Sequence, residues 1–345
     1  MSQQVFTDSL PDAPLNGPEV WRGAELAAVP EEWLVELDEQ DLDELEQLPD
    51  VDGPLHLADP AAFRLPRIAD KARRWRQVLE NGPGVLLVRG LPVAHVPTRR
   101  SAVLYWALGL AVGTPTPQDK RELYLADVRE DGAPGPDRFA YQTSVELPFH
   151  TDWCDVVSLL CLARSRSGGT SRIASSALVF NEILRRRPDL VVALAEPLWM
   201  NNRDEADGDV RPYYAASHVS WVDGKLSFRR RPSWRKRAAS SGRPQYLQQS
   251  AVDGPPPPSP AQTEVLALAD RIANEDGVAL TMDFRVGDAQ FINNHAVLHA
   301  RDAFVNGETS DEQRHLLRLW LTLPEGRALA PGYAVGIARQ HHLPA

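Results

Sequence analysis

Residues 149–162, FHTDWCDVVSLLCL, place the strongest restriction on the fold of this chain. The long apolar run predicts a buried strand, yet His150 and Asp152 stand at its head. Side chains two residues apart on a strand point to the same face, so these two are expected to project together. Buried polar groups cost free energy unless they are satisfied. The fold must therefore provide a partner for an imidazole and a carboxylate side by side.

Strands and helices occur in blocks along the rest of the chain. Apolar runs bounded by Gly and Pro predict further strands, and apolar residues at helical spacing predict flanking helices. Ser175 and Ser259 are suited to cap two of these helices. The expected helices cover residues 31–48, 71–84, 175–188 and 259–277, and the expected strands lie within 85–93, 139–162, 167–175, 278–294 and 314–323. Strands so far apart, with helices inserted between them, predict one closed or sandwiched β core with helical flanks.

Length and charge argue against several classes of protein. The 345 residues suffice for one large domain or two smaller ones, and the net charge of −10 disfavours nucleic acid or an anionic membrane as the main partner. No apolar stretch is long enough for a spanning helix, and the first residues lack the pattern of a secretory signal. Cys154 and Cys161 have no disulfide or zinc spacing and are expected to be small buried side chains. We therefore expect a cytoplasmic protein.

Metal binding would satisfy the polar pair. A histidine and an aspartate on one face form two corners of a 2-His-1-carboxylate triad, which leaves positions open on a non-haem Fe(II). A pair of this kind, taken alone, is more often a surface or hydrogen-bonded pair, and these residues by themselves leave that alternative open. The third ligand would come from NNHAVLHAR, residues 293–301, which offers His295 and His299.

Two arginines lie four residues apart in RHLLRLWL, residues 314–321. On a strand Arg314 and Arg318 share one face, and guanidinium groups in so apolar a segment need anionic partners. A dicarboxylate bound in bidentate fashion would provide them, and two structural salt bridges are the alternative. Taken with the metal-ligating pair and the distant histidine, the arginines indicate a site for a metal and a dicarboxylate.

The motifs HTD at 150–152, SGGTS at 167–171, NNHAVLHAR and RHLLRLWL together resemble the Fe(II)/2-oxoglutarate-dependent dioxygenases of the taurine dioxygenase and clavaminate synthase-like superfamily. The resemblance covers roughly residues 80–325, in the family's motif order. It implies a mainly β fold with flanking helices around a double-stranded β-helix, a cupin-like jelly roll. It also implies Fe(II) as metal, 2-oxoglutarate and O2 as cosubstrates, release of succinate and CO2, and oxidation of a C–H bond of the substrate.

The resemblance assigns the metal ligands residue by residue. His150 and Asp152 match the first two ligands, and His299 matches the distal one. His299 is preferred to His295 because the family's histidine directly precedes a small residue and an arginine. Halogenating relatives carry a small residue in place of the carboxylate, so Asp152 favours oxygenation or another outcome of hydrogen abstraction.

The resemblance also assigns the cosubstrate site. Arg314 matches the arginine that binds the far carboxylate of 2-oxoglutarate. Ser171 matches a hydroxyl residue, commonly Thr, that helps to hold the same carboxylate. Arg318 matches a second arginine near the site, which contacts either the cosubstrate or an acidic group of the substrate, and this sequence does not choose between them.

Candidate substrate contacts precede the HTD motif. Gln142, Ser144 and Glu146 share parity with His150 and are candidates for the same inner face, although Pro148 interrupts the ladder. A rim position or structural hydrogen bonding is the alternative for all three.

The segment RRRPSWRKR, residues 229–237, is strongly basic within an acidic protein. A solvated face is the common role of such a segment, and a docking patch for an acidic carrier protein that presents a tethered substrate is the sharper hypothesis. A role in nucleic-acid binding is disfavoured by the overall charge.

These observations predict a single catalytic domain over residues 1–345. Residues 1–80 would form an N-terminal helical flank, and residues 80–325 would form the core, with a lid insert at about 200–258. The expected activity is oxidation of a small carboxylate-bearing substrate, an amino acid or an amino-acid-derived intermediate of specialised metabolism. Hydroxylation is the default outcome; desaturation, cyclisation or a carrier-tethered substrate are alternatives. A non-catalytic β-helix protein that binds metal or ligand is the alternative from another class.

Overall fold

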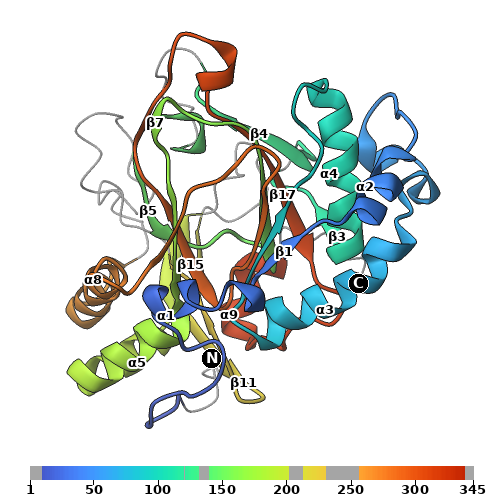
Figure 1. Cartoon of the computed structure of the whole chain (residues 1–345). Coiled ribbons are helices and arrows are strands. Elements are labelled where there is room, and N and C mark those ends of the chain that lie inside the picture. Colours follow the sequence, from blue (N-terminus) through green and yellow to red (C-terminus); the bar gives the residue numbers. More distant parts are fainter. Residues whose placement is uncertain (1–9, 120, 132–139, 202–212, 231–255, 339–345) are drawn as a thin grey trace.

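The computed structural model describes residues 10–119, 121–131, 140–201, 213–230 and 256–338 (Figure 1). Two β-sheets face each other at its centre. The larger sheet has the order β1 (Leu34–Glu36), β2 (Val85–Arg89), β14 (Ala289–Asn293), β6 (Val156–Ala163), β17 (His315–Thr322) and β3 (Thr114–Thr116), with β4 (Leu125–Arg129) also paired to β17. The smaller sheet has the order β13 (Leu280–Met282), β8 (Ser171–Ser175), β15 (Val297–Arg301) and β5 (Leu147–His150).

The inner faces of the two sheets share one core. Val157 and Ile292 from the larger sheet and Ile173 and Val297 from the smaller one are fully or almost fully buried in the same cluster. Antiparallel pairing dominates both sheets, and partners such as β6 and β17 lie far apart in the sequence. The expected double-stranded β-helix, or jelly roll, is therefore confirmed.

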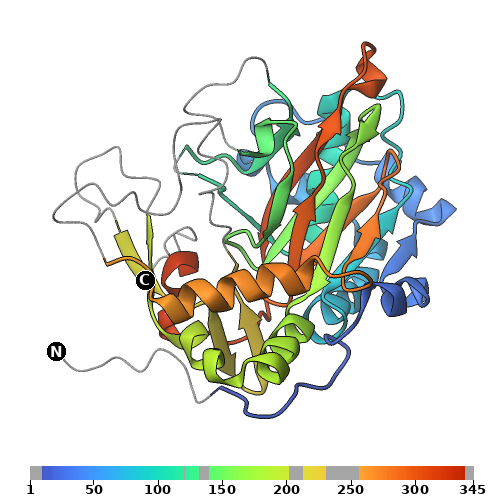
Figure 2. The same ribbon diagram turned by 90° about the vertical axis from the view of Figure 1, so that its left-hand side faces the viewer.

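Helices cover the outer faces of both sheets (Figures 1 and 2). Helices α3 (Pro66–Asn81) and α4 (Thr98–Val112) pack against the larger sheet and enclose a second cluster of buried apolar residues. Helices α5 (Ser176–Arg186) and α8 (Pro260–Ala273) do the same for the smaller sheet, and Figure 2 shows them side by side at the lower front of the molecule. The expected caps are present, since Ser175 Oγ accepts from the Leu178 N–H and Ser259 Oγ from the Gln262 N–H.

The remaining elements are short. The other helices are α1 (Gly23–Ala27), α2 (Glu39–Glu46), α6 (Val191–Ala195) and α9 (Pro331–Ala338), with 3-10 turns at Pro30–Glu32, Leu55–Leu57, Pro60–Phe63, Ala140–Gln142, Pro188–Leu190 and Ser310–Glu312. The other strands are β7 (Ser167–Gly168), β9 (Leu198–Asn201), β10 (Tyr213–Ala216), β11 (Val219–Val222), β12 (Lys225–Phe228) and β16 (Phe304–Val305). No helix in the described part of the chain is long and apolar enough to cross a membrane.

The single helix expected over 31–48 is wrong in its first half. Leu34–Glu36 forms β1, which pairs in parallel with β2, and only Glu39–Glu46 is helical. Asp38 sets the helix start, because its carboxylate accepts from the Asp41 N–H. Leu34 and Val35 pack into different apolar clusters, as alternate residues of a strand do. The predicted helical flank thus contributes a strand to the larger sheet.

The extended segment expected over 139–162 is interrupted twice. Residues 140–142 form a 3-10 turn, and residues 151–155 connect β5 of the smaller sheet to β6 of the larger one. His150 is therefore the last residue of one strand, and Asp152 lies in the connection, not on the same strand. The expectation that strand parity aligns them is wrong.

The described part of the 200–258 insert is folded onto the core. Strands β9 and β10 form one antiparallel pair and β11 and β12 another. Val219, Leu226 and Phe228 are buried in the cluster that contains α5 and α8. Residues 202–212 and 231–255 lie outside the described residues, and the lid role remains a prediction.

His218 makes the stability of the fold dependent on pH. Its ring is fully buried, Nδ1 lies 2.8 Å from the Arg229 carbonyl oxygen, and Nε2 has no hydrogen-bond partner among the described residues. Burial lowers the pKa of His218 to about 3. The unfolded chain takes up a proton below its ordinary pKa of about 6.5, while the folded chain does not until a much lower pH, so acidification favours unfolding.

We predict that His218→Gln reduces the pH dependence of stability. Through this side chain, lowering the pH from 7 to 5 is expected to reduce the unfolding free energy of the wild type by about 2 kcal/mol. Urea denaturation at the two pH values measures the difference, which should shrink by that amount in the variant. The same substitution at the exposed His95 is the control. An unchanged difference in His218→Gln would show that this histidine is not the source.

Candidate active site

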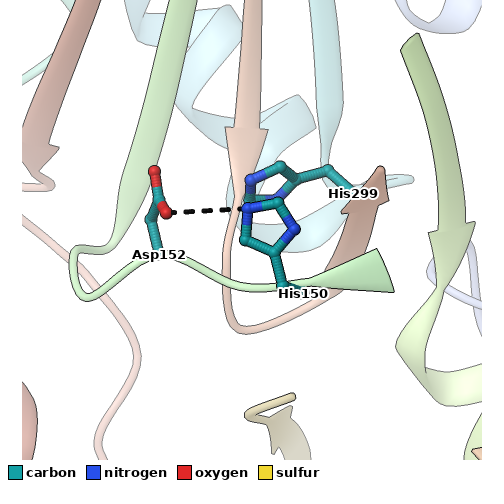
Figure 3. Close-up of side chains that lie close together, drawn as sticks. All are labelled: His150, Asp152 and His299. Carbon is teal, nitrogen blue, oxygen red and sulfur yellow. Dashed lines mark ion pairs between the residues drawn. The ribbon is translucent and has the colours of Figure 1, made fainter. Parts of the chain in front are cut away.

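Three side chains converge where β5 and β15 meet the larger sheet (Figure 3). His299 of β15 lies directly opposite His150 of β5 in the strand register, and their ring centroids are 4.2 Å apart. His150 Nε2 lies 3.9 Å from Asp152 Oδ1. One donor atom from each of the three residues lies within 4.8 Å of the others. The spacing suits a single metal ion.

Neighbouring groups orient the donors. His150 Nδ1 lies 2.8 Å from the Pro148 carbonyl oxygen, so Nδ1–H donates there and the lone pair of Nε2 faces Asp152. The backbone between the two ligands is also held, because the Thr151 N–H donates to the Arg230 carbonyl oxygen at 2.9 Å. These contacts place His150 and Asp152 together although they do not share a strand.

Burial and neighbouring charges keep Asp152 ionised and His299 unprotonated, the forms that bind a metal. Burial alone would raise the pKa of Asp152, but the neighbouring Arg318, His299 and His150 outweigh it and lower this pKa to about 2. Burial, with repulsion from His150, lowers the pKa of His299 to about 3. At neutral pH the group is thus a carboxylate with an unprotonated His299, and His299 Nδ1 is buried with no partner among the described residues. This donor set fits ferrous iron.

His295 lies apart from this group. It is 2% exposed, its Nε2 lies 3.0 Å from Asp155 Oδ1, and its Nδ1 lies 3.3 Å from the Tyr333 hydroxyl. Both ring nitrogens are therefore engaged in the core. Of the two histidines in NNHAVLHAR, His299 is the one placed beside His150 and Asp152.

A pocket opens beside the three donors. The space between its walls and mouth, open solvent included, is about 500 Å³. Its lining combines apolar walls with three arginines and one serine. Apart from the three donor residues, it is lined by Val128, Tyr141, Leu147, Val157, Leu159, Ser171, Phe284, Ala300, Arg301, Arg314 and Arg318.

Arg314 has the environment of an anion-binding residue. It is 5% exposed, its guanidinium lies over the Phe304 ring at 5.3 Å, and Nη1 is buried with no hydrogen-bond partner among the described residues. Burial lowers the pKa of Arg314 to about 10. No salt bridge of Arg314 is found within the described ranges, so the structural alternative is not supported for this residue. Arg318 does pair with Asp152.

The paired glycines of SGGTS make room for this arginine. Gly169 has a φ of +76°, and a Cβ there would lie 2.9 Å from Arg314 Nε. A Cβ at Gly168 would lie 2.2 Å from the Ala303 carbonyl oxygen. Ser171 follows on β8, 5% exposed, with Oγ 3.5 Å from the Gln290 side chain and on the pocket wall. The motif thus brings Ser171 and Arg314 to one pocket.

Arg318 lies closer to the metal ligands. Its Nε donates to Gln118 Oε1 at 2.7 Å, its Nη1 lies 3.4 Å from Asp152 Oδ2, and its guanidinium lies over the Tyr141 ring at 4.5 Å. Gln118 also donates to the Arg318 carbonyl oxygen at 2.9 Å. Sequence reasoning missed Gln118, since no local pattern links residues so far apart.

The three candidate substrate residues lie outside the strand whose parity suggested their shared inner face. Gln142 ends the 3-10 turn, and β5 begins only at Leu147, so strand parity does not apply to Ser144 or Glu146. Ser144 Oγ donates to Glu130 at 2.8 Å, and Glu146 pairs with Arg172 at 3.4 Å. None of the three lines the pocket; their neighbours Tyr141 and Leu147 do.

The basic segment 229–237 is not a continuous solvated face. Arg229 and Arg230 are 3% and 2% exposed. Arg229 donates to the Tyr333 carbonyl oxygen, and Arg230 Nε donates to Asp270 at 2.7 Å. Both arginines are core residues that anchor the insert, and residues 231–237 lie outside the described residues.

A jelly roll that brings two histidines and a carboxylate together, beside a buried arginine whose Nη1 has no partner among the described residues, defines the class of non-haem Fe(II) oxygenases. Residues 52–320 match the family described as "Taurine catabolism dioxygenase TauD, TfdA family". The chain belongs to this family and is an Fe(II)/2-oxoglutarate-dependent dioxygenase, with iron as its metal and 2-oxoglutarate as its cosubstrate.

Two individual proteins are similar to the chain over most of its length. The chain is 27% identical over 327 residues to FR-33289 synthase of Streptomyces rubellomurinus, covering 91% of this chain and 92% of that protein. It is 30% identical over 281 residues to the taurine hydroxylase-like protein SAT17 of Stachybotrys chartarum, covering 75% of this chain and 66% of that protein.

Solved structures share the fold. Asparagine oxygenase in complex with Fe(II), 3-hydroxyasparagine and succinate matches with a TM-score of 0.60 at 16% identity, covering 84% of this chain and 93% of that one. The non-haem iron oxygenase OrfP in complex with Fe and α-ketoglutaric acid matches with a TM-score of 0.57 at 14% identity, covering 84% and 94%.

Proposed function

We propose that this oxygenase oxidises a C–H bond of a small carboxylate-bearing substrate, an amino acid or an amino-acid-derived intermediate of specialised metabolism. Hydroxylation is the default reaction. The observation that carries the proposal is a pocket in which the metal ligands and Arg318 border the same space. Support also comes from asparagine oxygenase and from OrfP, whose structures hold a hydroxylated asparagine and a hydroxylated arginine.

In this proposal the metal ligands, Arg314, Ser171 and Arg318 have defined roles. His150, Asp152 and His299 hold the iron, and Arg314 with Ser171 binds the far carboxylate of 2-oxoglutarate. Bound iron, 2-oxoglutarate and O2 supply the oxidising chemistry, with succinate and CO2 as coproducts. Arg318, fixed by Gln118, presents positive charge at the side of the pocket next to Asp152, where it binds an acidic group.

The charge of the pocket narrows the substrate. Among the described lining residues Asp152 is the only carboxylate, whereas Arg301, Arg314 and Arg318 are cationic. A cationic side chain would therefore find no free carboxylate on the described walls. We propose a substrate that is neutral or acidic apart from its α-amino group.

Succinate formation tests the proposal. Protein loaded anaerobically with Fe(II) is exposed to O2 and 2-oxoglutarate with a panel of neutral, acidic and basic amino acids and a no-substrate control. Stimulation by a neutral or acidic amino acid is the expected result, and stimulation by basic ones alone would contradict the charge argument. Slow succinate release that no panel member stimulates would contradict a free amino acid as substrate and favour a modified or carrier-tethered one.

A further inference from the structure

The backbone at Asp152 is fixed by a residue of another hairpin. Asn294, in the connection between β14 and β15, accepts from the Asp152 N–H through Oδ1 at 3.0 Å. Its Nδ2 donates to the Cys154 carbonyl oxygen at 3.2 Å, and its own N–H donates to the Asp155 carbonyl oxygen at 2.9 Å. Asn294 is 1% exposed. With the backbone held in this way, the main remaining freedom of Asp152 is rotation of its side chain.

The two oxygens of the Asp152 carboxylate have different surroundings. Oδ2 accepts from the Trp320 indole N–H at 2.9 Å and lies 3.4 Å from Arg318 Nη1. Oδ1 faces the histidines and lies 3.9 Å from His150 Nε2. Trp320, on β17, is 7% exposed and packs in the core between the sheets. Its indole has a single N–H to donate, and that donor is directed at Asp152.

We propose that Trp320 is a positioning residue that makes Asp152 a one-oxygen ligand. Its N–H occupies Oδ2, so that only Oδ1 points to the metal. A carboxylate that rotated to bind through both oxygens would take up a further position on iron. The chemistry of a facial triad depends on keeping those positions open. The inference rests on the proposed metal site and adds the residue that sets its carboxylate geometry.

Arg318 is a less suitable candidate for this task. Its contact with Oδ2 is longer than that of the indole, and its guanidinium also borders the pocket, where it can bind an anion. A positioning group needs a fixed partner and a rigid side chain. The indole, packed in the core, meets both requirements.

The test compares two tryptophan substitutions. Trp320→Phe removes the N–H at Asp152, while Trp21→Phe removes an equivalent N–H that donates to the Pro83 carbonyl oxygen at 2.9 Å in the same core cluster. Anaerobic titration with Co(II) gives the metal affinity, and the visible absorption of bound Co(II) reports its coordination number. We expect Trp320→Phe to weaken Co(II) binding about 10- to 100-fold and to change the absorption, with both unchanged in Trp21→Phe.

The outcomes separate this inference from the proposed metal site. Wild-type affinity and absorption in Trp320→Phe would overturn the positioning role alone, whereas a wild-type protein that bound no Co(II) would overturn the site itself. If Trp320→Phe fails to fold, wild-type protein labelled with ¹⁵N in its indoles gives an independent measurement. The Trp320 N–H should resist exchange with solvent in the Zn(II)-loaded protein, and free exchange would contradict the inference.

Discussion

His299→Ala is expected to abolish succinate formation and to weaken Fe(II) binding by more than about 100-fold, beyond the effect of losing an outer-shell partner. The substitution removes one of three donors that lie within 4.8 Å of one another and leaves only His150 and Asp152. Anaerobic Fe(II) titration measures the affinity, and the succinate assay measures turnover. The melting temperature should change little, because a buried imidazole without a partner at Nδ1 stabilises the metal-free protein little.

His295→Ala is the matched control and should show the opposite pattern. Its ring contacts Asp155 and Tyr333 in the core, so its loss is expected to cost about 2–3 kcal/mol of unfolding free energy. Iron affinity and turnover measured below the melting temperature should remain close to wild type. Full activity in His299→Ala combined with loss of iron binding in His295→Ala would show that the distal ligand had been misassigned.

The parts of the fold that follow from local chemistry could be predicted from the sequence. Ser175 and Ser259 cap their helices as expected, because a cap depends on residues only three positions away. Residues 31–48 could not be read correctly, because Leu34–Glu36 becomes a strand only through pairing with Leu87 and its neighbours. Helical spacing cannot reveal a partner strand so distant in the chain.

In the candidate site, too, the residue types could be predicted from the sequence, whereas the contacts between distant residues could not. The residue types at 150, 152 and 299 indicate a metal, yet strand parity, the reason given for uniting His150 with Asp152, does not hold. The structure joins them through a turn, and Thr151 is held there by Arg230. Contacts of this kind link residues far apart and leave no periodic pattern. For the same reason Gln118 and Trp320, which contact Arg318 and Asp152, could not be found from the sequence.

Arg314→Met is expected to raise the concentration of 2-oxoglutarate needed for half-maximal binding about 30- to 150-fold, which corresponds to 2–3 kcal/mol for one charge-assisted bidentate contact. Isothermal titration of the Zn(II)-loaded protein without O2 measures this affinity directly. Arg164→Met, at an exposed arginine paired with Asp283, is the control and should leave the affinity unchanged. Equal affinities in Arg314→Met and wild type would exclude Arg314 from the cosubstrate site.

Arg314→Met weakens ligand binding, but it should not destabilise the fold of the protein without ligand. A structural arginine contributes to stability through its partners, but Arg314 is buried with Nη1 unpaired among the described residues, and burial lowers its pKa to about 10. The Phe304 ring offsets part of its desolvation, and a bound anion would offset the rest. Arg314→Met should therefore keep or raise the unfolding free energy without 2-oxoglutarate, while losing the stabilisation that the ligand gives the wild type. Thermal melts with and without 2-oxoglutarate distinguish this result from a structural role, in which the variant would be destabilised in both conditions. An arginine that lowers the stability of the ligand-free fold is explained by its role in ligand binding.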